Sequence, residues 1–111
     1  MKIDEVFKQY ESFITFKSDH YGKSTLFQNE QLLVGLNCLQ PGQGMEKHDH
    51  EIQSRFYIVL EGNGRIGVGE TQNDTARGMV IWVPPGQPHW IKNTGSQPMV
   101  LLVGISPSKC D

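Results

Sequence analysis

The apolar residues of this chain fall into short runs, separated by polar segments rich in glycine and proline. Seven runs have the character of strands: Ser24–Phe27, Leu32–Leu39, Phe56–Leu60, Arg65–Val68, Met79–Val83, His89–Lys92 and Met99–Ile105. They are shorter than a typical helix, and a turn signal recurs about every 8–12 residues. This pattern predicts an all-β sandwich or barrel.

The N-terminal segment has a different pattern. Apolar side chains there recur every three or four residues, at Ile3, Val6, Phe7 and Tyr10. This spacing predicts one or two helical turns or an irregular arm. Phe13–Phe16, which follows, consists of β-prone residues and favours a strand.

Two polar segments are expected to be connections between strands. Gly62-Asn63-Gly64 predicts a hairpin between Phe56–Leu60 and Arg65–Val68, because Asn and Gly tolerate the positive φ of tight hairpin turns. Gly69–Arg77 is polar without an apolar pattern and is expected to be a second hairpin loop.

The run Leu32–Leu39 is apolar at nearly every position, as in a strand that is covered on both faces. One cover is expected to be the barrel interior, and the other a neighbouring sheet or subunit. We therefore expect a homodimer whose interface uses an N-terminal strand and the outer faces of apolar strands such as this one.

Length and charge narrow the classes of protein to which the chain can belong. Its 111 residues predict a single domain, with residues 1–30 as an arm and first strands and residues 31–106 as the barrel core. A net charge of −2 with both signs interspersed argues against nucleic acid and anionic membranes as partners. The sequence has no signal-peptide pattern and no apolar run near 18 residues, so we expect a cytoplasmic protein. Cys38 and Cys110 form no metal-binding pattern and are expected to stay reduced.

Three of the four histidines suggest a metal site. His48 and His50 are two residues apart, so in an extended strand their rings face the same side. His89 follows a Pro-Pro-Gly turn after another strand-like run. Three neutral imidazoles bind transition metals and leave coordination positions open for water or substrate. His20 lies in a polar loop and is expected to face solvent.

The spacing around these histidines resembles the two sequence motifs of the cupin superfamily. The first motif is matched at Gly42, His48, His50 and Gly62, and the second at Gly78, Pro84, Gly86, His89 and Asn93. The resemblance implies a small double-stranded β-helix, or jelly-roll barrel, that holds one divalent transition metal on its three histidines. It leaves open which metal binds (Fe, Mn, Ni, Zn or Cu), and the fold carries many unrelated functions.

The first motif departs from the family where a glutamate is expected. Arg55 occupies that position, and a guanidinium cannot be deprotonated to serve as a ligand. The amide oxygen of Gln53 is one candidate to complete the metal shell. Glu46 is another, although it could instead form an ion pair with Arg55. Water alone is the third.

The residues beside the predicted metal suggest the chemistry of a ligand. Arg55 and Tyr57 share a strand face, so both are candidates for substrate binding. Arg55 could bind a carboxylate or point outward into solvent, and Tyr57 could donate its hydroxyl or only pack in the barrel. We expect a small metal-dependent enzyme, dioxygenase-like or isomerase-like, that acts on an oxygenated anionic small molecule. The alternatives are a non-catalytic binding or sensor module, and an interaction protein with a structural metal.

Three further residues of the second motif region have expected places. Trp90 follows His89 and should face away from it, to cover the outside of the barrel or fill an interface, whereas Trp82 could line either face. Asn93 is expected to fix the following turn through an Asx-type hydrogen bond.

Overall fold

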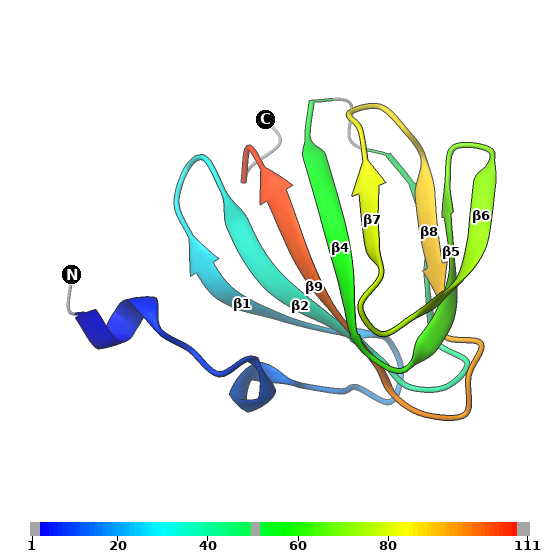
Figure 1. Ribbon diagram of the computed structural model, residues 1–111, viewed down its shortest axis with the longest axis horizontal. Coiled ribbons are helices and arrows are strands. Elements are labelled where there is room, and N and C mark those ends of the chain that lie inside the picture. The colour runs from blue at the N-terminus through cyan, green and yellow to red at the C-terminus, as the bar shows by residue number, and fades with distance from the viewer. Residues whose placement is uncertain (1–2, 50–51, 109–111) are drawn as a thin grey trace.

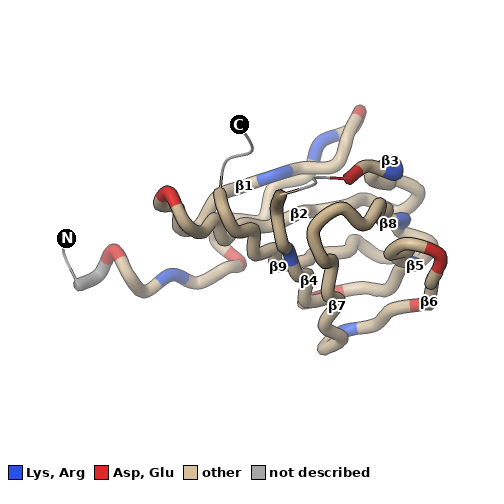
Figure 2. The backbone as a smooth tube through the Cα atoms, turned by 90° about the horizontal axis from the view of Figure 1, so that it is seen from above, with Lys and Arg blue, Asp and Glu red and all other residues tan. Residues whose placement is uncertain are grey.

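The structure of this protein is a computed structural model that describes residues 3–49 and 52–108. Two antiparallel sheets face each other and form a small barrel (Figure 1). Seen from above, the sheets form two layers, and the N-terminal arm extends to one side (Figure 2). Residues of both charge signs are scattered over the arm, loops and strands in that view. The all-β jelly-roll architecture predicted from the sequence is confirmed.

The larger sheet has five strands. In spatial order they are β1 (Gly22–Gln28), β2 (Leu33–Leu39), β9 (Met99–Ser106), β4 (Ser54–Glu61) and β7 (Val80–Val83). Burial alternates along β4, where Arg55, Tyr57 and Val59 are buried and the residues between them are partly exposed. Alternate residues of a strand face opposite sides, so these three point into the barrel.

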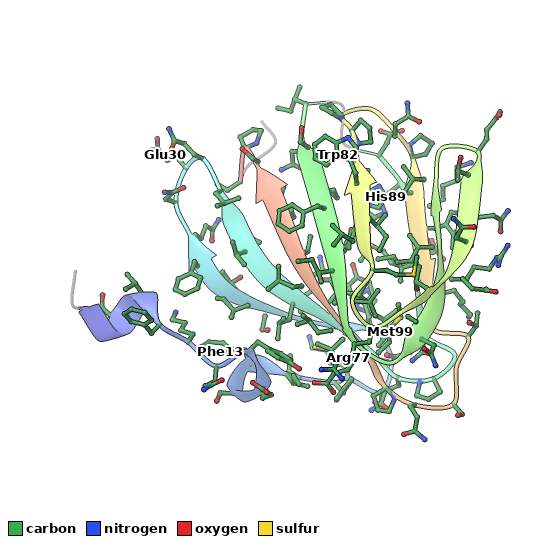
Figure 3. All side chains as sticks on the ribbon, in the orientation of Figure 1. Phe13, Glu30, Arg77, Trp82, His89 and Met99 are labelled. Atoms are coloured by element: carbon green, nitrogen blue, oxygen red, sulfur yellow. The ribbon has the colours of Figure 1, made fainter. Side chains whose placement is uncertain are left out.

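The smaller sheet has four strands and closes the other side of the barrel. In spatial order they are β3 (Gly44–His48), β8 (His89–Lys92), β5 (Asn63–Val68) and β6 (Thr71–Ala76). Between the two sheets lies an apolar core that includes Leu39, Ile91, Met99 and Leu101. Figure 3 shows Met99 near the lower end of the barrel and His89 in its upper half, so the polar site lies above this core.

The N-terminal arm covers the outer face of β2. It contains two short 3-10 helices, η1 (Ile3–Val6) and η2 (Tyr10–Phe13). A second apolar cluster forms where the arm packs on Leu36 and Cys38, through Tyr10, Phe13, Ile14 and Phe16. Figure 3 shows Phe13 where the arm passes beneath β1 and β2. No helix among the described residues is long and apolar enough to cross a membrane.

This packing changes the interpretation of the run Leu32–Leu39. From Gly35 to Leu39 the run is buried on both faces, as expected, whereas Leu32 is exposed, and the arm of the same chain supplies the second cover. The homodimer therefore stays a prediction. The strand predicted at Phe13–Phe16 is wrong, because residues 14–17 pair with no strand. The Phe13 carbonyl instead accepts a hydrogen bond of 2.7 Å from the Ser24 hydroxyl.

The hairpin loop predicted at Gly69–Arg77 is wrong, because most of this segment is the strand β6. It pairs in register with β5 from Asn63↔Ala76 to Val68↔Thr71. Only Thr75 of this strand is buried. Because most of an edge strand is exposed to solvent, its sequence has no apolar pattern from which a strand could be predicted.

The hairpin predicted at Gly62 is also wrong. β4 belongs to the larger sheet and β5 to the smaller, so the chain changes sheets here. Gly62 has φ of +82°, and a Cβ at this position would collide with the Pro98 carbonyl oxygen. A glycine is therefore needed at this corner, where the backbone at Pro98 passes close to it.

Candidate metal and anion site

His48 and His89 meet across the smaller sheet. His48 ends β3, His89 begins β8, and the two residues are direct partners in the antiparallel register. Their ring centroids are 4.1 Å apart, with the planes inclined by 54°. Two of the three predicted metal ligands are therefore side by side. His50, the third, lies outside the described residues, and so does any contact that it makes.

A backbone contact sets the tautomer of His48. Its Nδ1 lies 2.8 Å from the carbonyl oxygen of Glu46. Because a carbonyl can only accept, Nδ1 carries the proton and the lone pair is on Nε2. A histidine held in this way presents Nε2 to a metal.

The carboxylate of Glu46 does not take part in this arrangement. Glu46 is exposed on β3, where the register with β8 shifts between Met45 and His48. The single ion pair among residues 3–49 and 52–108 joins Arg65 and Asp74. The alternative of a Glu46–Arg55 ion pair is therefore not realised.

Tyr57 lies beside His89 in the interior. Its side chain is fully buried, and its hydroxyl oxygen is 3.2 Å from His89 Nε2 and 3.8 Å from Met45 Sδ. Burial raises the pKa of Tyr57, and the Arg55 guanidinium offsets part of this rise. Its hydroxyl therefore joins the strand β4 to the histidines of the smaller sheet.

Arg55 points into the barrel, so the alternative in which it faces solvent is wrong. Only 7% of the residue is exposed. Its Nη2 donates to the amide oxygen of Gln53 at 3.0 Å, and its Nη1 makes a long contact of 3.5 Å with the Tyr57 hydroxyl. Both partners are neutral groups, so within the described residues no carboxylate balances this buried charge.

Gln53 is held from both ends of its amide. Its Nε2 donates to the carbonyl oxygen of Pro107 at 3.0 Å, while its oxygen accepts from Arg55. The amide oxygen of Gln53, which the sequence suggests as a metal ligand, therefore already accepts a hydrogen bond from the guanidinium. An amide oxygen has two lone pairs, so ligation by Gln53 stays a prediction.

A cavity of about 280 Å³ is lined by part of this cluster, and the fully buried Tyr57 and His89 are not among its described lining residues. Its lining includes His48, Gln53 and Arg55, together with residues of the two strands β1 and β2. Lys23 and Arg55 are the charged residues that line it, and no described carboxylate does so. A cavity of this size admits a small-molecule ligand. Its electrostatic character favours an anion.

Sequence reasoning missed some residues of this cavity. Asn37 lines it from β2 and is buried. Asn37 is a polar residue inside the apolar run Leu32–Leu39, two positions from the inward-facing Leu39. This position could have identified it as a polar residue of the interior. Lys23 and Tyr21 come from β1 and the residue before it, where nothing in the sequence distinguishes them from surface residues.

The aromatic and turn residues near the second motif are also placed by the structure. Trp82 is 58% exposed, on the outer side of β7 (Figure 3). Trp90 lies over Gly67 of β5, where an added Cβ would collide with its indole nitrogen. It therefore covers the sheet face opposite His89, as expected. Asn93 fixes its turn as predicted, because its side-chain oxygen accepts from the Gly95 amide at 3.0 Å.

Comparison with known proteins adds a family model and several relatives. The model, described as "Cupin domain", matches residues 35–105. An uncharacterized protein of Methanocaldococcus jannaschii, MJ1618, is 33% identical over 55 residues, which are 50% of this chain and 44% of that protein. The chain thus spans less than half of that relative.

Two solved structures show the similarity of the fold in more detail. The crystal structure of TT1209 from Thermus thermophilus superposes with a TM-score of 0.88 at 34% identity and covers 91% of this chain and 96% of that one. A predicted oxalate decarboxylase from Thermotoga maritima superposes with a TM-score of 0.72 at 26% identity, covering 77% of this chain and 78% of that one.

Proposed function

We propose, from the premise that this chain belongs to the cupin family, that the protein is a small metal-dependent enzyme that acts on an oxygenated, anionic small molecule. His48, His50 and His89 would hold one divalent transition metal, with Gln53 as a further candidate ligand. Arg55 and Tyr57 would contact the substrate. The reaction would be of the dioxygenase or isomerase type.

The chemistry of the donor set supports the metal. His48 is held with its lone pair on Nε2, and its ring lies beside that of His89 on the neighbouring strand. Imidazole nitrogen is a ligand for all first-row transition metals of this kind. Such a metal, when bound, would polarise a carbonyl or carboxylate oxygen as a Lewis acid.

The buried charge of Arg55 is the observation that best supports an anionic substrate. A buried guanidinium with only neutral partners is costly to the fold. The protein keeps it at a cavity whose described lining has no carboxylate. A substrate carboxylate placed there would supply the missing counter-charge and accept a forked pair of hydrogen bonds. The similarity to a predicted decarboxylase of a dicarboxylate, oxalate, agrees with this class of substrate.

Calorimetry can test this function on metal-loaded protein. Oxalate, pyruvate and acetylacetone would be titrated, with the neutral diamide oxamide as the control of matching shape. We expect the two carboxylates to bind, acetylacetone to bind as its enolate on the metal, and the diamide not to bind. We expect EDTA-treated protein to lose most of the affinity. Equal affinity for oxalate and oxamide would contradict the proposal.

The alternative is a non-catalytic module that binds the same ligand. NMR of each bound anion over hours, in air, separates the two. Consumption of a ligand by the parent but not by the EDTA-treated protein supports an enzyme. Binding without any conversion across a wider panel of carboxylates and diketones would favour a sensor or carrier.

A further inference from the structure

We propose that Tyr57 is the anionic oxygen ligand of this site and takes the role that the family motif gives to the glutamate replaced here by Arg55. This inference rests on the metal function proposed above. It names a residue of this chain that completes the metal shell from within the barrel.

The first support is the distance between Tyr57 and His89. The hydroxyl oxygen and His89 Nε2 are 3.2 Å apart. Two donors that are each about 2.1 Å from one metal ion and separated by this distance subtend an angle of about 100° at the metal. That angle lies between the octahedral and tetrahedral values. A single ion could therefore replace the contact between these two atoms with little movement of either side chain.

The second support is the rigidity of the tyrosine. Tyr57 is fully buried in the core and lies in the middle of β4, where it pairs with Val103 on one side and Ile81 on the other. A ligand fixed by its strand and its packing keeps its donor atom in place. The exposed carboxylate of Glu46 has no such support, and the Gln53 oxygen already accepts from Arg55.

The third support is the balance of charge. A divalent metal beside a guanidinium would place two cations close together, and no described carboxylate lines the cavity to offset them. A phenolate oxygen at Tyr57 would lie between both, because Arg55 Nη1 is 3.5 Å from the same oxygen. If a metal bound there, the Tyr57 hydroxyl would give up its proton to solvent in exchange for the metal–oxygen bond. The site keeps a positive charge after this step, so it still attracts an anionic substrate.

Iron(III) provides the test, because its phenolate complexes absorb strongly in the visible range and show tyrosinate ring modes in resonance Raman spectra. The parent protein would be loaded anaerobically with iron(II) and then oxidised in air. The chain has three tyrosines. The variant Tyr10→Phe/Tyr21→Phe retains Tyr57 alone and includes a matched change at Tyr21, which lines the cavity together with Arg55.

We expect the band and the ring modes in the parent and in the double variant, and their loss in Tyr57→Phe with its iron content retained. A band that survives in Tyr57→Phe would overturn the proposal. So would stoichiometric iron without the band in the parent, an outcome that leaves the metal function standing. A parent that binds no iron would overturn both. If Tyr57→Phe does not fold, the double variant still decides, because only Tyr57 can give its tyrosinate modes.

Discussion

Replacing Arg55 with methionine separates a ligand-binding arginine from a structural one. Methionine is unbranched, flexible and uncharged, so it fills much of the space of the arginine stem while the guanidinium is removed. The structure predicts a loss of ligand affinity with little change in stability, because Arg55 faces a cavity and has only neutral partners.

The loss of affinity follows from one charge-assisted contact. A hydrogen bond to a charged group contributes about 1.5–3 kcal/mol, so the affinity for a small carboxylate should fall by a factor of about 10–150. The metal content should not change, because a guanidinium is no ligand.

The effect on folding comprises two terms of similar size. Replacing buried charged groups with well-packed apolar side chains is neutral or stabilises a protein by up to about 4 kcal/mol. The Gln53 oxygen loses the Arg55 donor at the same time, which costs about 1–3 kcal/mol for a buried acceptor. These terms offset, so we expect the free energy of unfolding to stay within about 2 kcal/mol of the parent.

The assay pairs isothermal calorimetry on metal-loaded protein with urea unfolding of the same preparations. Arg65→Met is the matched control, because Arg65 is also an arginine on a strand but lies at the surface in an ion pair with Asp74. It should bind carboxylates like the parent. Unchanged carboxylate affinity in Arg55→Met, combined with a loss of stability above about 3 kcal/mol, would refute the reasoning and make Arg55 a structural residue.

Three further predictions concern the arm, the corner and the buried thiol. Phe13→Ala should lower the free energy of unfolding, measured in urea, by about 1.5–2.5 kcal/mol, which is less than the loss for a fully buried phenylalanine. Phe7→Ala is the control and should change this free energy little, because 73% of Phe7 is exposed. Gly62→Ala should cost about 1–3 kcal/mol more than Gly42→Ala, because both glycines have positive φ but only Gly62 adjoins another backbone; equal thermal shifts would contradict this. Burial raises the pKa of the Cys38 thiol above its ordinary value of 9.0, so its contribution to stability is present below that pH and is lost as pH rises through the folded-state pKa. The parent should therefore lose more stability between pH 7 and pH 10 than Cys38→Ala, as measured by urea unfolding at both pH values.

The barrel could be predicted from the sequence because its inward faces repeat a simple pattern. β4 alternates between buried and partly exposed residues from Ser54 to Leu60, and the glycine and proline positions mark the turns around it. The motif spacing predicts that His48 and His89 meet, and the register of β3 and β8 places them side by side, while their role as metal ligands stays a prediction. Where the period of two was present, the prediction was correct.

The remaining features depend on contacts that a linear pattern does not contain. β6 is polar because it is an edge strand, and Gly62 resembles a hairpin glycine although it turns the chain between two sheets. The inward orientation of Arg55 was one of two alternatives, and its partners Gln53 and Tyr57 lie only two residues away, within reach of the period of two. The approach of Pro107, whose carbonyl oxygen accepts from the Gln53 amide, depends on tertiary packing and could not be read from the sequence.

The metal content of the protein tests the central claim most directly. Protein purified without a metal-affinity step would be analysed by inductively coupled plasma mass spectrometry, beside His20→Ala and the double variant His48→Ala/His50→Ala. His20 is exposed and bonds to the Tyr21 carbonyl, so it is a matched control. We predict about one divalent transition-metal ion per chain in the parent and in His20→Ala, and essentially none in the double variant. A stoichiometric metal that persists in the double variant, or a parent purified without any, would contradict the account.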